Sequence, residues 1–178
     1  MVRDGVVRDV EILEPRDVST PGAVDLGAAT ASEAARYLLA LARGSETQPG
    51  VEQAIFPVML ADVDGLWRDL LELARDRTTR QAVRRGALFW LGQEAGEAAT
   101  AGIAAVAADE QEDQGVRDAA IFALSQRPAD QGVPALMELA RSAREAETRK
   151  GAMFWLAQSE DERVLAFFEE ILLRRQPC

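Results

Sequence analysis

The sequence contains no histidine, and its single cysteine, Cys178, is the last residue. Without histidine the chain cannot form a histidine-ligated metal site, a Ser-His-Asp triad or a Cys-His dyad. One cysteine excludes a disulfide within the chain, so cysteine says nothing decisive about the redox compartment. The motifs GxGxxG, GxxxxGK[ST], HExxH and CxxC are also absent. We therefore predict a protein that is not an enzyme and that carries no cofactor and no metal ion.

Basic residues and long apolar runs are scarce as well. The 20 Lys and Arg residues are outnumbered by 30 Asp and Glu residues, which gives a formal net charge of −10. A surface of this sign repels phosphate backbones and anionic headgroups, so we expect no nucleic-acid partner. No stretch approaches the roughly 18 apolar residues of a membrane-spanning helix, and residues 1–12 lack the apolar core of a signal peptide. We expect a soluble chain without membrane insertion, cytoplasmic or exported with its signal already removed.

Alanine and leucine are abundant by contrast. Hydrophobic residues make up 48% of the chain, aromatic residues make up 6%, and only seven prolines interrupt it. This composition excludes intrinsic disorder and favours helices over strands. The predicted fold class is therefore all-α.

An internal repeat organises the chain. The segments 83–93, 116–126 and 148–158 align without gaps, at steps of 33 and 32 residues. Each has arginine at its second position, alanine at its fifth, phenylalanine at its seventh, leucine at its ninth and glutamine at its last. A weaker copy places Ala54 and Phe56 one period earlier. A repeat of this length is typical of helical arrays.

Apolar residues recur with the same period between these segments, so each unit is predicted to be a pair of helices, A and B. The predicted A helices span 31–43, 63–76, 96–108, 131–143 and 161–174, and the B helices span 51–61, 79–93, 114–126 and 147–158. The B helices are apolar nearly all round and need neighbours on most sides. Because one pair can bury its apolar face only against the next, we predict a stack of about four pairs plus a terminal helix.

Local signals sharpen some boundaries. Pro134 is predicted in the first turn of its A helix, where a missing N–H has no cost. Ser159 and Glu162 form a capping-box pattern before the last A helix. Pro57 stands where the next repeat has Trp90, and it should kink or shorten its B helix.

Residues 1–27 differ from the rest of the chain. Residues 6–13 mix apolar and charged residues in partial alternation, and prolines and a glycine follow. We predict a short strand with no sheet to join, left to pair with a partner, another protomer or nothing, and then an irregular segment. The predicted organisation is an N-terminal segment at 1–27, a repeat domain at 28–175 and a tail at 176–178.

The repeated residues carry a family resemblance. The pattern Val-Arg-x-x-Ala-x-x-x-Leu on the second helix of each pair resembles HEAT-like repeats, the group that includes the phycobilisome lyase repeats. The recurring Ala-x-Phe-Trp-Leu-x-Gln, with the ending Phe167-Phe-Glu-Glu-Ile-Leu172, is similar to bacterial HEAT-repeat proteins. The resemblance covers about residues 30–174 and implies a right-handed α-α superhelix that acts as a scaffold or adaptor.

The repeated Arg84, Arg117 and Arg149 invite a basic-patch interpretation, but a structural ladder is favoured. In the resembled repeats this arginine pairs with an acidic or backbone acceptor in the adjacent repeat. Acidic residues that can serve lie just upstream of each arginine, and they are Asp76, Asp113 and Glu145. Neighbour-to-neighbour interfaces of this kind supply most of the stability of a repeat array.

The phenylalanine series is the sharper hypothesis. In the resembled repeats the equivalent position faces the concave surface and is polar, whereas here it is Phe56, Phe89, Phe122 and Phe154. An exposed row would form an apolar stripe suited to an extended peptide or a partner helix. The favoured alternative is that each ring packs between adjacent B helices as core, because periodic apolar residues are usually buried.

Two polar rows accompany the phenylalanines, one charged and one of glutamine. A glutamine row binds a peptide backbone or closes helix ends, and both interpretations stay open. Trp90 and Trp155 are expected to be buried. The candidate partner-binding residues are Arg85, Phe89, Gln93, Asp118, Phe122, Gln126, Lys150, Phe154 and Gln158.

The acidic run 109–113 joins an A helix to its B helix. Carboxylates suit Ca²⁺, but the run lacks the ordered spacing of a calcium loop, so we expect a solvated turn.

These observations favour a non-enzymatic interaction module that binds a peptide or a partner protein along the B-helix face. The alternative implied by the resemblance is a lyase or isomerase acting on a tetrapyrrole-bearing partner. The missing histidine and the terminal position of Cys178 disfavour it. A HEAT-like glycosylase role on nucleic acid is disfavoured by the net charge of −10.

Overall fold

The computed structural model describes residues 2–3, 6–7, 27–44, 54–61, 63–93 and 97–174, and these are almost entirely helical. The helices in chain order are α1 (Ala31–Arg43), α2 (Ile55–Leu60), α3 (Leu66–Arg75), α4 (Gln81–Gln93), α5 (Glu97–Ala108), α6 (Gln114–Ser125), α7 (Ala129–Ser142), α8 (Ala146–Ala157) and α9 (Glu162–Arg174). The all-α prediction is confirmed.

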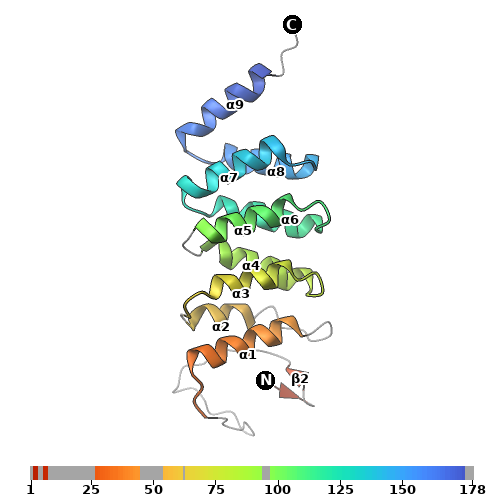
Figure 1. Cartoon of the computed structure of the whole chain (residues 1–178), viewed down its shortest axis with the longest axis vertical. Helices are drawn as coiled ribbons and strands as arrows, with labels where there is room; N and C mark the ends of the chain where they lie inside the picture. The colour runs from red at the N-terminus through yellow and green to blue at the C-terminus, as the bar shows by residue number, and fades with distance from the viewer. Residues whose placement is uncertain are drawn as a thin grey trace.

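Consecutive helices pack as pairs, and the pairs form two layers. Within pairs, α3 packs on α4, α5 on α6 and α7 on α8. Between pairs, α4, α6 and α8 lie side by side in one layer, and α3, α5 and α7 lie side by side in the other. Figure 1 shows the pairs stacked along the long axis, with α1 at one end and α9 at the other. The odd-numbered helices are the A helices of the sequence repeat, and the even-numbered ones are the B helices.

The core follows the repeat because equivalent residues meet the same neighbours in each pair. Leu70, Leu73 and Ala74 of α3 are fully buried, and so are the equivalent apolar residues of α5 and α7. On α4 the buried positions include Val83 and Ala87. Each layer therefore buries its apolar stripe against the other layer and against the pairs above and below.

Two glycines permit close approaches between helices. A Cβ atom on Gly132 of α7 would overlap the carbonyl oxygen of Leu124 on α6. A Cβ on Gly92 of α4 would lie 3.0 Å from the carbonyl oxygen of Ala123 on α6. At both places the backbone of the neighbouring helix occupies the space that the Cβ atom of any other residue would take.

Two predicted signals at helix starts are wrong. Helix α7 begins at Ala129, so Pro134 lies inside it rather than in its first turn. Pro134 removes one intrahelical hydrogen bond there, and its ring is exposed. Before α9, the backbone N–H of Arg163 donates to Asp161 Oδ1 at 2.9 Å, while Ser159 Oγ accepts only from the N–H of Asp161.

The cap of α9 is therefore Asp161 rather than Ser159. Hydrogen bonds from the side chain and backbone of Arg163 lower the pKa of Asp161 to about 2. A capping box that we did not predict begins α1, where the N–H of Glu33 donates to Thr30 Oγ1 and the N–H of Thr30 donates to Glu33 Oε2.

The N-terminal part departs from the repeat in two ways. Helix α2 holds Pro57 and has six residues, fewer than the other helices described, as predicted; its predicted residues 51–53 lie outside the described part. Strands β1 (Val2–Arg3) and β2 (Val6–Val7) pair antiparallel, with Val2 opposite Val7. The expectation of a strand with no sheet to join is wrong, since β2 pairs with β1, which comes just before it in the sequence. The remainder of that prediction, residues 8–26, is outside the described residues.

Candidate functional site

Each B helix presents the same face of its repeat to the outside. Positions spaced by three and four residues project from one side of a helix, so the charged, phenylalanine and glutamine rows line up on adjacent helices. We call this surface the repeat face, and it consists of Arg85, Phe89 and Gln93 on α4, Asp118 and Phe122 on α6 with its C-cap Gln126, and Lys150 and Phe154 on α8 with its C-cap Gln158. All of these side chains are exposed except Phe122, which is half-buried.

The phenylalanine row is not core, and the favoured interpretation was wrong. Phe56, Phe89 and Phe154 expose 47%, 42% and 57% of their surface. The core side of α4 is already filled by residues such as Ala87 and Leu91, which are fully buried. The phenylalanines stand on the opposite side of the B helices, where their rings contact other aromatic rings. Trp90 and Trp155, expected to be buried, are half-buried against the core.

Ring contacts join the B helices in one continuous chain. The rings follow one another in the order Phe56, Trp90, Phe89, Phe122, Trp155 and Phe154. Successive centroids lie between 5.1 and 6.5 Å apart, the range of favourable aromatic pairs. The chain crosses α2, α4, α6 and α8, so the aromatic row is a single surface rather than separate exposed rings.

The chain of aromatic rings is built differently between α4 and α6. At α2–α4 and α6–α8 an indole makes the contact between the helices, since Trp90 stacks on Phe56 and Trp155 meets Phe122 at a tilt of 56°. In α6 the equivalent position is Ala123, which is fully buried. With no indole there, Phe89 stacks directly on Phe122, with centroids 6.5 Å apart and planes 11° apart.

A groove opens beside this stacked pair. It has a volume of about 780 Å³ and is lined by Ala82, Arg85, Gly86 and Phe89 of α4 and by Gly115, Asp118, Ala119 and Phe122 of α6. Its floor is made of alanine and glycine, its end is the pair of phenyl rings, and its two rims carry opposite charges. Four of the nine candidate partner-binding residues line this one groove, and they are Arg85, Phe89, Asp118 and Phe122.

The charged residues of the repeat face differ in their partners. Asp118 accepts a hydrogen bond from Gln114 Nε2 at 2.7 Å, and Lys150 pairs with Glu147 at 2.6 Å. In the described part of the chain, no carboxylate lies within ion-pair distance of Arg85. The Arg85 rim of the groove is therefore a solvent-exposed cation whose charge no described side chain neutralises.

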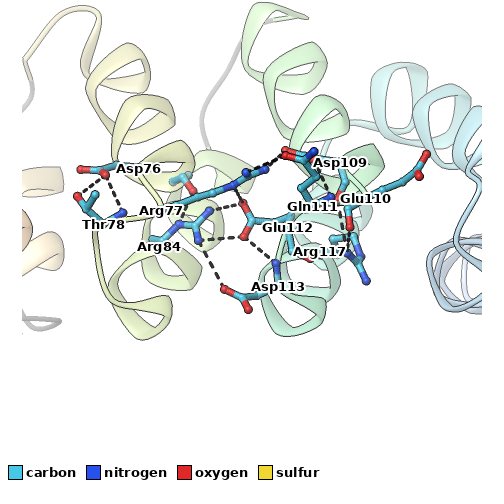
Figure 2. Close-up of polar contacts among 11 residues, drawn as sticks. Asp76, Arg77, Thr78, Arg84, Asp109, Glu110, Gln111, Glu112, Asp113 and Arg117 are labelled. Carbon is cyan, nitrogen blue, oxygen red and sulfur yellow. Dashed lines mark hydrogen bonds and ion pairs between the residues drawn. The ribbon is translucent and has the colours of Figure 1, made fainter.

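The repeated arginines lie on the other side of the B helices, in the interior. Arg84 is 1% exposed; its Nε donates to the Ala74 carbonyl at 2.8 Å, and its two terminal nitrogens bind the carboxylate of Glu112 in the next repeat. Figure 2 shows this pair between the two repeats, with Arg77 alongside. Asp113 lies 3.9 Å from Arg84, whereas Asp76 accepts hydrogen bonds from Thr78 and Thr79 instead.

The other two repeated arginines bind backbone carbonyls of the loop before their own helix. Arg117 donates to the carbonyls of Glu110, at 3.3 Å, and Glu112. Arg149 donates to the carbonyl of Ala143 at 2.7 Å. Of the three arginines, Arg84 alone joins two repeats through a carboxylate in the contacts described.

The acidic run 109–113 is a turn, as expected, but it is only partly solvated, because Glu110 and Asp113 are exposed whereas Glu112 is not. Glu112 is buried against Arg84, Asp109 pairs with Arg77 at 2.6 Å, and Glu110 lies 3.3 Å from the exposed Arg144. These ion pairs occupy carboxylates that a bound cation would need as ligands.

One buried arginine was missed by sequence reasoning. Arg127, at the end of α6, is 5% exposed and donates to Thr100 Oγ1 at 3.0 Å and to Gln131 Oε1 at 2.8 Å. It lines a cavity of about 250 Å³ together with Trp155 and Gln158. The repeat gave no signal for it, because the equivalent residue of the next repeat is Ser159.

Across the described ranges, no group of three or more His, Cys, Asp or Glu side chains is arranged to hold a metal ion. Nor does any helix in those ranges combine the length and the apolar character needed to cross a membrane.

Comparison with known proteins gave no match to a family model, to a curated protein or to a solved structure.

Proposed function

We propose that this chain is a protein-interaction module, a right-handed HEAT-like superhelix whose repeat face binds a peptide or a partner protein. One observation carries the proposal: the repeat places a phenylalanine at the same position of successive B helices, exposed in Phe56, Phe89 and Phe154 and half-buried in Phe122, and aromatic contacts join these rings into one continuous surface. The function is that of a scaffold or adaptor without enzymatic activity.

Exposed aromatic surface of this extent supports a binding role. An exposed apolar patch rimmed by polar residues marks interaction sites on soluble proteins, and aromatic residues are enriched in protein interfaces. Phe89 and Phe154 lie on such a surface, with Arg85 and Lys150 one turn before them and Gln93 after. The arrangement of an apolar centre and polar borders is that of an interface before its partner is bound.

The groove itself supports binding rather than catalysis. Among the described residues that line it, Arg85 and Asp118 are the only titratable ones, and they come from different helices, α4 and α6. Acid–base or nucleophilic catalysis needs groups within hydrogen-bond reach of one reacting atom.

The stacking of helix pairs supports the superhelical arrangement. Each pair repeats after 32 or 33 residues and meets the next through both of its helices, α3 with α5 and α4 with α6. A small constant rotation between such units generates a superhelix with an extended binding surface.

Site-specific photocrosslinking in the native host tests the proposal. A photoreactive phenylalanine analogue at position 89 should capture a partner, because it replaces an exposed ring of the repeat face that also lines the groove. The matched control carries the same analogue at Leu165, an exposed residue of α9 outside the face. Crosslinked species should come from position 89 alone.

A triple variant provides the second arm of the test. Replacing Phe89, Phe122 and Phe154 with serine should abolish the crosslinked or co-purified partner while leaving the helical circular dichroism unchanged. The control is Leu165→Ser with Leu172→Ser, which removes exposed apolar surface elsewhere. Retention of the partner by the triple variant, or equal capture from position 165, would refute the proposed function.

A further inference from the structure

The groove between α4 and α6 has a shape that points to one form of partner. Both of its walls come from positions i, i+3, i+4 and i+7 of a helix, which are Ala82, Arg85, Gly86 and Phe89 on α4 and the equivalent residues on α6. A groove with such walls runs along the helix axes, over about 10 Å or two helical turns. It is thus parallel to α4 and α6, whereas the aromatic chain runs across them.

The floor of the groove allows a close approach. A Cβ on Gly115 would have its nearest neighbour, Gln81 Oε1, 3.9 Å away, so the space above it is open. Helices pack by inserting ridges of one into the groove of another, at axial distances of about 8–10 Å that shrink as the contact residues become smaller. Ala82, Gly86, Gly115 and Ala119 give the small contact residues that a third helix would need to lie between α4 and α6.

An extended, proline-rich segment fits this surface less well. Such segments insert proline rings into slots between aromatic side chains. Here the rings of the chain already contact one another, with centroids 6.5 Å apart at the widest step, between Phe89 and Phe122. A ring inserted between two parallel rings requires a separation of about 7 Å, twice the contact distance of carbon atoms. The contacting rings therefore leave no slot for a proline ring, but an apolar side chain can pack against them.

The rims of the groove add a charge pattern. Arg85 on the α4 rim is exposed and without a carboxylate neighbour in the described residues, and Asp118 on the α6 rim is exposed and bound only by Gln114. Charged residues on either side of an apolar seam select the partner and its direction in helical assemblies. A helix in this groove would be matched by an acidic residue on its Arg85 side and a basic residue on its Asp118 side.

We propose that the groove between α4 and α6 binds an amphipathic α-helix of a partner protein, seated lengthwise. The apolar stripe of that helix lies on the alanine and glycine floor and against Phe89 and Phe122, with an acidic flank toward Arg85 and a basic flank toward Asp118. The inference rests on the proposed function and names the form of the partner.

Selection from two displayed libraries tests the inference. One library is a stable helical hairpin scaffold with one randomised helix face, and the other is a library of random proline-rich 12-residue peptides. Both are selected against the purified full chain. We expect groove-dependent binders from the helical library, with apolar residues at i, i+3 or i+4 and i+7, acids on one flank and bases on the other.

Variants that fill the groove identify the binding place. Gly115→Leu and Ala82→Leu put bulk on the floor without disturbing the core, and both should weaken the selected helical binders at least tenfold. Ala101→Leu is the matched control, since it adds the same side chain at an exposed position of α5. Circular dichroism and thermal melting establish that each variant is folded.

Charge reversal tests the direction of the bound helix. Arg85→Glu should weaken a selected helical binder about fivefold, the effect expected of an exposed ion pair. The double variant Arg85→Glu with Asp118→Arg should instead prefer a version of the binder with its two charged flanks exchanged.

The outcomes separate this inference from the proposed function. The helix-in-groove inference would be overturned if the helical binders tolerate Gly115→Leu. It would also be overturned if only proline-rich binders are found and they are lost in the phenylalanine-to-serine triple variant. In both cases the repeat face would remain a binding surface. If neither library yields a binder sensitive to that triple variant, both proposals fail.

Discussion

At the scale of single residues, Arg84, Arg117 and Arg149 show how one repeated position acquires different surroundings. Arg84 is held by the Ala74 carbonyl and by the carboxylate of Glu112. Glu145, which lies one period after Glu112, is exposed, and Arg117 binds carbonyls of its own loop instead. A buried guanidinium needs acceptors for its donors, and backbone carbonyls can accept these hydrogen bonds where no carboxylate is in reach.

The pair Arg84–Glu112 should be the most sensitive polar contact of the molecule. Arg84→Ala or Glu112→Ala leaves one buried charge without its partner, and we expect a loss of about 3–5 kcal/mol in the free energy of unfolding. Denaturant titration followed by circular dichroism measures this loss.

Two further variants show whether burial of the charge is the cause. Arg84→Met with Glu112→Leu replaces both partners by apolar groups and should recover most of the stability. Arg149→Ala, at a half-buried site without a carboxylate partner in the described contacts, should cost less than Arg84→Ala. Equal losses for Arg84→Ala and Arg149→Ala would contradict the explanation.

The sequence could predict which residues of the repeat face belong together, but not whether they are exposed. Period alone aligned Phe89, Phe122 and Phe154, and a periodic apolar residue is usually core. Exposure depends on how the helix is rotated about its axis. Because α4 has apolar residues on most of its sides, its sequence pattern does not indicate which side faces the core. The groove was equally beyond prediction, because it depends on how the side chains of α4 and α6 lie against one another across the two helices.

At the scale of elements, glycines distinguish close contacts from open surface. Gly132 of α7 has the Leu124 carbonyl where its side chain would be, whereas Gly115 of α6 faces open space. The same residue type therefore serves tight packing at one place and an empty groove at the other.

The substitution of glycine by alanine should have opposite effects at these two positions. Gly132→Ala forces α7 away from α6 and should lower the free energy of unfolding by about 1–3 kcal/mol. Gly115→Ala restricts the unfolded chain and improves the helix, so it should raise stability by about 0.4–1 kcal/mol. Thermal and denaturant unfolding of the two variants compares them directly, and destabilisation of similar size in both would show that helix packing at Gly132 is not the cause.

Helix positions were predictable to within a few residues because the repeat fixes where each pair must lie. The errors fall at ends, where single side chains decide. Asp161 instead of Ser159 caps α9, and α7 extends upstream of Pro134 to Ala129. Such choices depend on local hydrogen bonds that the apolar period does not register.

At the scale of the whole molecule, the ends of the stack differ from its centre. Helices α5 and α6 have helix pairs on both sides, whereas α9 follows the last pair and lies at the end of the stack (Figure 1). Its polar contacts to α7 include the ion pair Arg141–Glu170 at 2.8 Å and the hydrogen bond from Arg163 to the Ala129 carbonyl, also at 2.8 Å. Leu165, Leu172 and Leu173 of α9 remain exposed.

Local stability should therefore fall toward α9. Native-state hydrogen exchange measures the free energy of the opening that exposes each backbone amide. For α5 and α6 this free energy should equal that of global unfolding, and for α9 it should be smaller because local opening suffices. Mass spectrometry of exchange at increasing denaturant resolves the two classes. Equal protection of α6 and α9 would mean that the chain unfolds as one cooperative unit.

The ring chain also gives the molecule an optical property. Two of its three tryptophans, Trp90 and Trp155, lie in the chain on either side of the groove, and the third, Trp67, belongs to α3 with Arg68 over its ring. Each of the two indoles is in edge contact with the phenylalanine that precedes it, so whatever settles against Phe89 or Phe122 changes the polarity and ring geometry that the indoles sense. The emission and near-ultraviolet dichroism of the unlabelled protein thus carry a built-in readout of an occupied groove.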